Sequence, residues 1–73
     1  MLMSASGGED VRRAEEFLKR RMGLRQTLNA KRVIEEAQGQ GYKAEAVQRA
    51  IAAMIMRSEL MEHGGRKLLK RIR

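Results

Sequence analysis

The sequence lacks several features that would assign it to large classes of proteins. It has no cysteine and no proline in 73 residues, only two aromatic residues, and its most apolar stretch is residues 50–56. Without cysteine there is no disulfide, no thiolate chemistry and no cysteine-based zinc or iron–sulfur site. A membrane-spanning helix needs about 20 apolar residues, so none is expected. The scarcity of aromatic side chains argues against base stacking on single-stranded nucleic acid.

Residues suited to catalysis are also scarce. The chain has one histidine and one tyrosine, and neither a Ser–His–Asp set nor a His–Glu–x–x–His motif. Gly39-x-Gly41 lacks the third glycine and the preceding strand of a dinucleotide site, and no Gly-Lys-Ser/Thr phosphate loop is present. A chain this short forms one domain without room for a deep cavity. We therefore expect no enzymatic activity, cofactor, metal site or small-molecule substrate.

Positive charge is the main compositional feature. Sixteen Lys and Arg residues stand against nine Asp and Glu residues, giving a formal net charge of +7. A field of this sign attracts polyanions, of which nucleic acid is the favoured candidate. The N-terminus has neither a basic segment nor a long apolar segment and so does not resemble a signal peptide. We expect a protein of the cytoplasm, nucleoid or nucleus that is not secreted and has no membrane partner.

Hydrophobic periodicity predicts three helices after a flexible segment over residues 1–8. The helices are expected over residues 9–22, 30–37 and 43–58, within one domain over 9–73. Apolar residues recur at helical spacing in each, at Val11, Ala14, Phe17, Leu18 and Met22, at Val33, Ile34 and Ala37, and at Val47, Ala50, Ile51, Met54 and Ile55. These positions predict the core faces of the three helices.

Glycines and capping residues predict where the helices meet. Gly23 stands where the C-terminal glycine of the first helix belongs, and either Thr27 or Asn29 can cap the second. The residues between Gly23 and Asn29 are expected to form a short connector. The pair Gly39 and Gly41 predicts a turn between the second and third helices.

The C-terminal segment is compatible with two structures. Gly64-Gly65 is a hairpin signal, which predicts two antiparallel strands over residues 60–62 and 67–72. The spacing of Leu68, Leu69 and Ile72 also fits a short amphipathic fourth helix. We favour the hairpin.

This order of helix, helix, tight turn, helix and glycine-tipped basic hairpin resembles the winged helix-turn-helix family. The resemblance runs from about Val11 to Ile72 and is strongest over residues 33–37, residues 42–51 and the Leu60-Met61 pair. In that family, the apolar residues of these segments form one small core. The resemblance implies a mainly α fold with a small β-hairpin, a three-helix winged helix-turn-helix domain.

Charge and resemblance together predict binding to duplex DNA, with the third helix in the groove and the basic wing on the backbone. With Val47 inward, Gln48 and Arg49 face outward, where they can read adenine and guanine respectively. The predicted nucleic-acid contacts are Lys31, Arg32, Lys43, Gln48, Arg49, Arg66, Lys67, Lys70 and Arg71.

A second function is left open by the end of the third helix. Ala52, Ala53 and Met56 are apolar residues on the side that should be exposed. Such a surface is typical of a homodimer contact or of a site for a protein partner. The alternative prediction is therefore a winged-helix protein-interaction or dimerisation module of a larger assembly.

Overall fold

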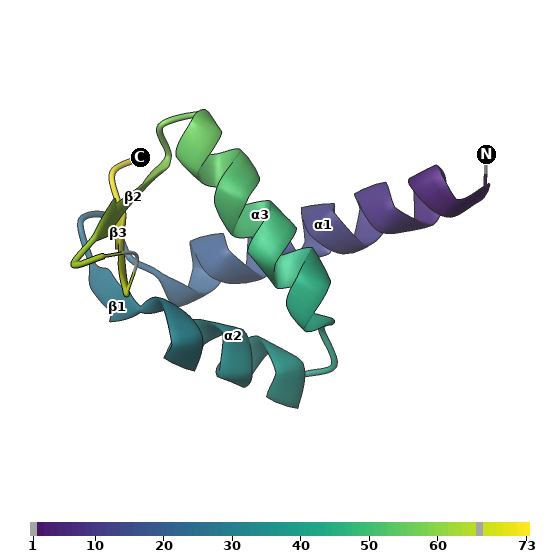
Figure 1. The fold of residues 1–73 in the computed structure, drawn as a ribbon, viewed down its shortest axis with the longest axis horizontal. Helices are drawn as coiled ribbons and strands as arrows, with labels where there is room; N and C mark the ends of the chain where they lie inside the picture. Colours follow the sequence, from purple (N-terminus) through teal and green to yellow (C-terminus); the bar gives the residue numbers. More distant parts are fainter. Residues whose placement is uncertain (1, 66) are drawn as a thin grey trace.

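The computed structural model describes residues 2–65 and 67–73, with side chains from residue 8 onward. Six elements follow one another along the chain (Figure 1): α1 (Leu2–Arg21), β1 (Thr27–Asn29), α2 (Ala30–Gly39), α3 (Ala44–Met56), β2 (Leu60–His63) and β3 (Leu68–Arg71). The three helices pack around one another, and a small sheet lies at one end of the helical layer. This is the mainly α, three-helix winged helix-turn-helix arrangement that the sequence predicted.

The sheet has three antiparallel strands in the order β1-β3-β2. The β2–β3 pair confirms the hairpin that was favoured for the C-terminal segment, and the alternative prediction of a fourth helix is wrong. Both tip glycines have left-handed backbones, with φ of 57° at Gly64 and 66° at Gly65, as a tight hairpin turn requires. The sequence did not predict β1. The residues expected to be a connector instead pair with β3 through Thr27, Leu28 and Asn29.

Five helix boundaries differ from those predicted. α1 spans Leu2–Arg21 rather than residues 9–22, α2 continues to Gly39 rather than residue 37, and α3 spans Ala44–Met56 rather than residues 43–58. α3 stops early because Ser58 is left-handed (φ 59°) and the Glu59 N–H donates to the carbonyl of Met54 at 2.8 Å. The flexibility of residues 1–8 and the domain boundary at residue 9 stay predictions.

Local caps account for the ends of α1 and α2. Asn29 is the N-cap of α2, and its side chain accepts a hydrogen bond from the Arg32 N–H at 3.1 Å. This confirms Asn29 and not Thr27 as the capping residue. Gly23 follows the end of α1 as expected, but the left-handed backbone in this turn is that of Arg25, with φ of 66°. At the other end of α2, Gly41 (φ 97°) turns the chain toward α3.

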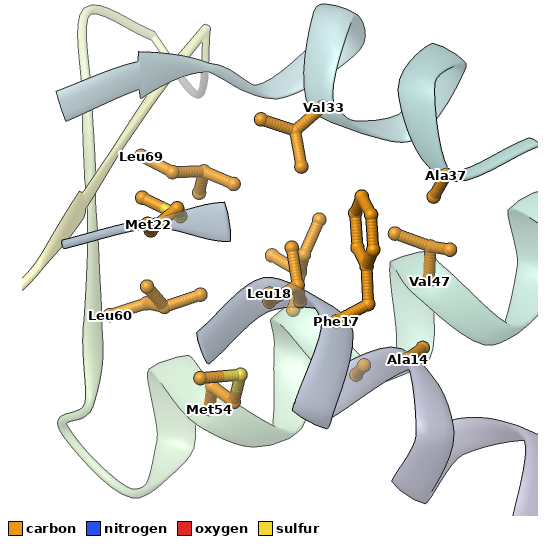
Figure 2. Close-up of a cluster of buried hydrophobic side chains, with 12 residues drawn as sticks. Ala14, Phe17, Leu18, Met22, Val33, Ala37, Val47, Met54, Leu60 and Leu69 are labelled. Carbon is orange, nitrogen blue, oxygen red and sulfur yellow. The ribbon is translucent and has the colours of Figure 1, made fainter. Parts of the chain in front are cut away.

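All three helices and two strands contribute to the core (Figure 2). The largest fully buried side chains are Leu18, Met22, Val33, Val47, Met54, Leu60 and Leu69. The predicted inward residues of α3 are buried except Ile55, which is half-buried, as is Ile34 of α2. Phe17 stacks at a tilt on Tyr42, with ring centroids 5.1 Å apart, and so joins α1 to the segment that leads into α3.

Two leucines on either side of the α1 terminus provide a test of this core. Leu18 is fully buried, whereas Leu24 is 63% exposed. Leu18→Ala should lower the free energy of unfolding by about 2–5 kcal/mol, because it leaves a cavity among well-packed neighbours. Leu24→Ala removes the same atoms from an exposed site and should change the free energy of unfolding by no more than about 0.5 kcal/mol. Urea unfolding measures both values, and equal effects would contradict the packing described.

Candidate nucleic-acid interface

The exposed face of α3 carries the side chains predicted to read bases. Gln48 and Arg49 are both exposed. Arg49 lies 3.5 Å from the carboxylate of Glu45, one helical turn earlier, and both side chains are mostly in solvent. An exposed pair of this kind contributes little stability. The Arg49 guanidinium is therefore held only weakly and can exchange Glu45 for another acceptor.

Lys43 lies at the start of α3, where the sequence predicted a phosphate contact. It occupies the N-cap position without a capping side-chain hydrogen bond. Its ammonium is 3.9 Å from the carboxylate of Asp10 on α1, and the lysine side chain is largely exposed. This long, solvated pair leaves the ammonium accessible at the helix N-terminus.

A second group of cations gathers where α2 meets the wing. The Ala30 N–H donates to the carbonyl of Lys67 at 2.8 Å, which places the start of α2 beside the segment entering β3. Lys31 and Arg32 in the first turn of α2 and Lys67 are all exposed. Among the described residues, none of these three makes an ion pair. We call Lys31, Arg32 and Lys67 the α2–wing cluster.

The other predicted wing contacts are separated by the alternation of β3. Lys70 is half-buried on the outer face of the sheet, opposite Thr27 on one side and Met61 on the other. Arg71 is on the opposite face. Arg66 lies outside the residues that the structure describes. The contacts of all of these with nucleic acid stay predictions.

Arg71 holds the end of α1. Its Nη1 donates to the carbonyls of Met22 at 2.8 Å and Lys19 at 3.0 Å, and its Nε donates to the carbonyl of Arg73 at 2.7 Å. The last carbonyls of a helix lack intrahelical partners and carry partial negative charge, so a guanidinium there caps the helix. The sequence did not reveal this role, because 52 positions separate Arg71 from Lys19.

Two further arginines form ion pairs between elements. Arg57 donates to Glu15 on α1 and to Glu59, the latter at 3.1 Å. Arg21 donates to both oxygens of Glu36 on α2, at 2.6 and 3.1 Å. Hydrogen bonds from Arg57 hold the pKa of Glu59 below its usual value, and those from Arg21 do the same to the pKa of Glu36. These arginines are therefore engaged in the fold.

One open hollow of about 300 Å³ lies beside β1 and α2, and Leu28, Val33 and Arg32 are among the residues that line it. In the part of the chain that the structure describes, no group of three His, Asp or Glu side chains is placed to hold a metal ion. None of the helices there has the length and apolar character needed to span a bilayer.

The fold and the basic surface define a winged helix-turn-helix domain. Comparison with protein families matches residues 13–71 to the family described as MCM5, C-terminal domain. The match covers most of the chain, and the chain belongs to this family. Curated proteins and solved structures gave no match.

The pairing of Arg57 predicts a dependence of stability on pH. Because the pKa of Glu59 is lowered in the folded state, its contribution is fully present above about pH 4.5 and is lost as the pH falls through the folded-state pKa. Arg57→Gln should raise the pKa of Glu59 toward its usual value and make stability less sensitive to acid. NMR titration of the Glu59 carboxyl and urea unfolding across the acid range measure both effects.

The matched control for Arg57 is Arg12→Gln. Arg12 is exposed on α1 and makes no ion pair with any described residue. Arg12→Gln should therefore leave the pKa of Glu59 unchanged. If Arg57→Gln also leaves that pKa unchanged, the pair does not form in solution.

Proposed function

We propose that this domain binds duplex DNA, and that the α2–wing cluster provides the main contact with the phosphate backbone. The hydrogen bond between the Ala30 N–H and the Lys67 carbonyl carries this proposal, because it brings cations from two distant parts of the chain together. Lys31, Arg32 and Lys67 form no ion pair with a described carboxylate, so binding to phosphate breaks none. Their counterions are released when phosphates replace them.

The start of α2 supports the same contact through the partial positive charge of the helix N-terminus and through its rigid first turn. The first N–H groups of a helix lack intrahelical partners and carry partial positive charge, which favours an anion. Asn29 accepts one of these groups, from Arg32, and the Lys67 carbonyl accepts that of Ala30. The cap holds the first turn rigidly, so that Lys31 and Arg32 are presented from a fixed backbone.

In this proposal α3 enters the major groove and Lys43, Gln48 and Arg49 contact the DNA from it. The groove admits one α-helix, and glutamine and arginine can each form two hydrogen bonds with a purine. Gln48 and Arg49 are adjacent and exposed, and only the solvated carboxylate of Glu45 competes for Arg49. The Arg71 guanidinium already donates to the carbonyls of Lys19, Met22 and Arg73, so it is not among the main contacts of this proposal.

The family match indicates the kind of assembly in which this domain would bind DNA. We propose that the domain is a module of a larger MCM assembly, in which DNA binding positions the domain and other parts of the assembly act on the DNA. A contact that relies mainly on phosphates suits such a module, since it carries little sequence preference.

Neutralising the α2–wing cluster should weaken duplex binding. Lys31→Ala and Lys67→Ala should each reduce the slope of log affinity against log salt by about 0.9, since each removes about one phosphate contact. Arg12→Ala, which removes an exposed charge from α1, should change the slope much less. Fluorescence anisotropy with a labelled duplex over a series of salt concentrations measures these slopes. Affinity that does not fall with salt would rule out the proposal.

A second function is favoured by one observation on α3. Met56 is 86% exposed at the end of the helix, with Ala52 exposed and Ala53 half-exposed one turn before it. An apolar side chain presented this far into water is typical of a contact with another protein chain. The second candidate is thus a protein-interaction or dimerisation module that uses Ala52, Ala53 and Met56.

Met56→Glu separates the two functions. If the α3 surface holds a second copy, the variant should shift sedimentation at high protein concentration from dimer to monomer, because a carboxylate would be buried without a partner. Met61→Glu is the control, as it places the same charge on a different exposed methionine. Duplex binding by Met56→Glu should stay within about twofold of the parent. A monomeric parent protein would exclude the dimer.

A further inference from the structure

The sheet has an outer face that the helices leave uncovered. Along β2 and β3, Leu60 and Leu69 point into the core, so Met61 and Leu68 point away from it and are 47% and 37% exposed. Ile72 continues this face: its N–H donates to the carbonyl of Glu59 at 3.0 Å, and its side chain is 39% exposed. Three of the five large exposed apolar side chains described thus share one surface.

A lysine lies at the centre of this apolar surface. Lys70 pairs in register with Met61 on β2 and Thr27 on β1, and Leu68 and Ile72 lie two residues before and after it on the same face. Such cross-strand neighbours are about 5 Å apart and residues two apart along a strand about 7 Å. Lys70 is half-buried and makes no ion pair with the described residues. Its charge is therefore framed by apolar side chains.

The charges around this face select its partner. Lys67 precedes β3 and Arg73 follows it, and the carboxylate of Glu59, whose backbone carbonyl accepts from the Ile72 N–H, is bound to Arg57. A second copy of the chain would bring Lys70 against like charges, and three side chains fall short of the about 800 Å² per partner of a stable dimer. Phosphates would satisfy Lys70 but leave the apolar groups in water. An acidic and apolar protein segment satisfies both.

We propose that this outer sheet face, formed by Met61, Leu68, Lys70 and Ile72, docks an acidic amphipathic helix of a partner protein. A glutamate or aspartate of that helix pairs with Lys70, and apolar residues one turn before and one turn after it cover Leu68 and Ile72. The spacing fits: residues eight apart in a helix are about 12 Å apart, and Leu68 and Ile72 are about 13 Å apart along β3. The face shares no residue with the α2–wing cluster or with the α3 surface.

A designed peptide tests this proposal. The probe is an alanine-based helix with one glutamate flanked four residues away on each side by leucine, held helical by a side-chain cross-link on the opposite face. On titration into the ¹⁵N-labelled domain, it should shift the amide signals of Met61 and of residues 68–72. The same peptide with glutamine in place of glutamate should bind about tenfold more weakly, since it cannot pair with Lys70.

Variants of the domain assign the contact. Met61→Gln should weaken peptide binding by about tenfold, as expected for an apolar side chain at the centre of an interface. Lys70→Met keeps the apolar stem and should bind the glutamate and glutamine peptides equally. Met56→Gln, the matched methionine on α3, should bind as the parent does. Thermal melting of each variant confirms that it is folded.

Three results would overturn the proposal. The first is that the amide signals of β2 and β3 do not shift at up to about 1 mM peptide. The second is that Met56→Gln and Met61→Gln weaken peptide binding equally. The third is that phosphatidylserine vesicles shift these amide signals and the peptide does not. Duplex binding is measured on the same variants and should not change with Met61→Gln. Loss of DNA binding in Lys31→Ala with intact peptide binding would separate the two surfaces.

Discussion

The position of β3 between β1 and β2 is the constraint on which the rest of the structure depends. Its four residues pair with both other strands of the sheet. Leu69 packs into the core from the inner face of the sheet. The backbone of Arg71 forms hydrogen bonds with Arg25 and Gln26 in the turn after α1. The Arg71 side chain then caps α1 itself. Without β3, the edge strand β1 and the ends of α1 and α2 would lose their partners.

A chain of this size has little apolar surface to bury, so polar contacts between elements define much of the geometry. Arg21, Arg57 and Arg71 each join segments that are far apart in sequence. These arginines therefore differ from the lysines and arginines of the α2–wing cluster, which face solvent with no described partner. The sixteen lysines and arginines thus include some that hold the fold and others that are available to bind an anion.

Placing the functional surfaces on β3 and its neighbours has a physical consequence. Successive residues of a strand point to opposite faces, so Leu69 and Arg71 serve the core while Leu68 and Lys70 face outward. The outward residues can change without loss of core packing. A small domain can in this way present separate surfaces to a nucleic acid and to a protein within a larger assembly.

Several elements were predictable because their signals are local. The spacing of Val33 and Ala37 predicted the buried face of α2, and the glycine pair predicted the hairpin. The cap of α2 was narrowed to Thr27 or Asn29, and the structure shows that it is Asn29. β1 was missed because Thr27-Leu28-Asn29 has no strand pattern of its own and becomes a strand only where β3 runs beside it. The early end of α3 was missed because Ser58 has a left-handed backbone, which is not predictable from a serine in the sequence.

The candidate surfaces divide in the same way. The sequence by itself determined that the protein is basic and mainly helical, because these properties follow from composition and periodicity. Only the tertiary structure decided which cations form ion pairs or helix caps within the fold. It also decided that Arg71 caps α1 and that Met61, Leu68 and Ile72 surround Lys70. Pairing between distant residues depends on strand register and helix packing, and neither is encoded in local spacing.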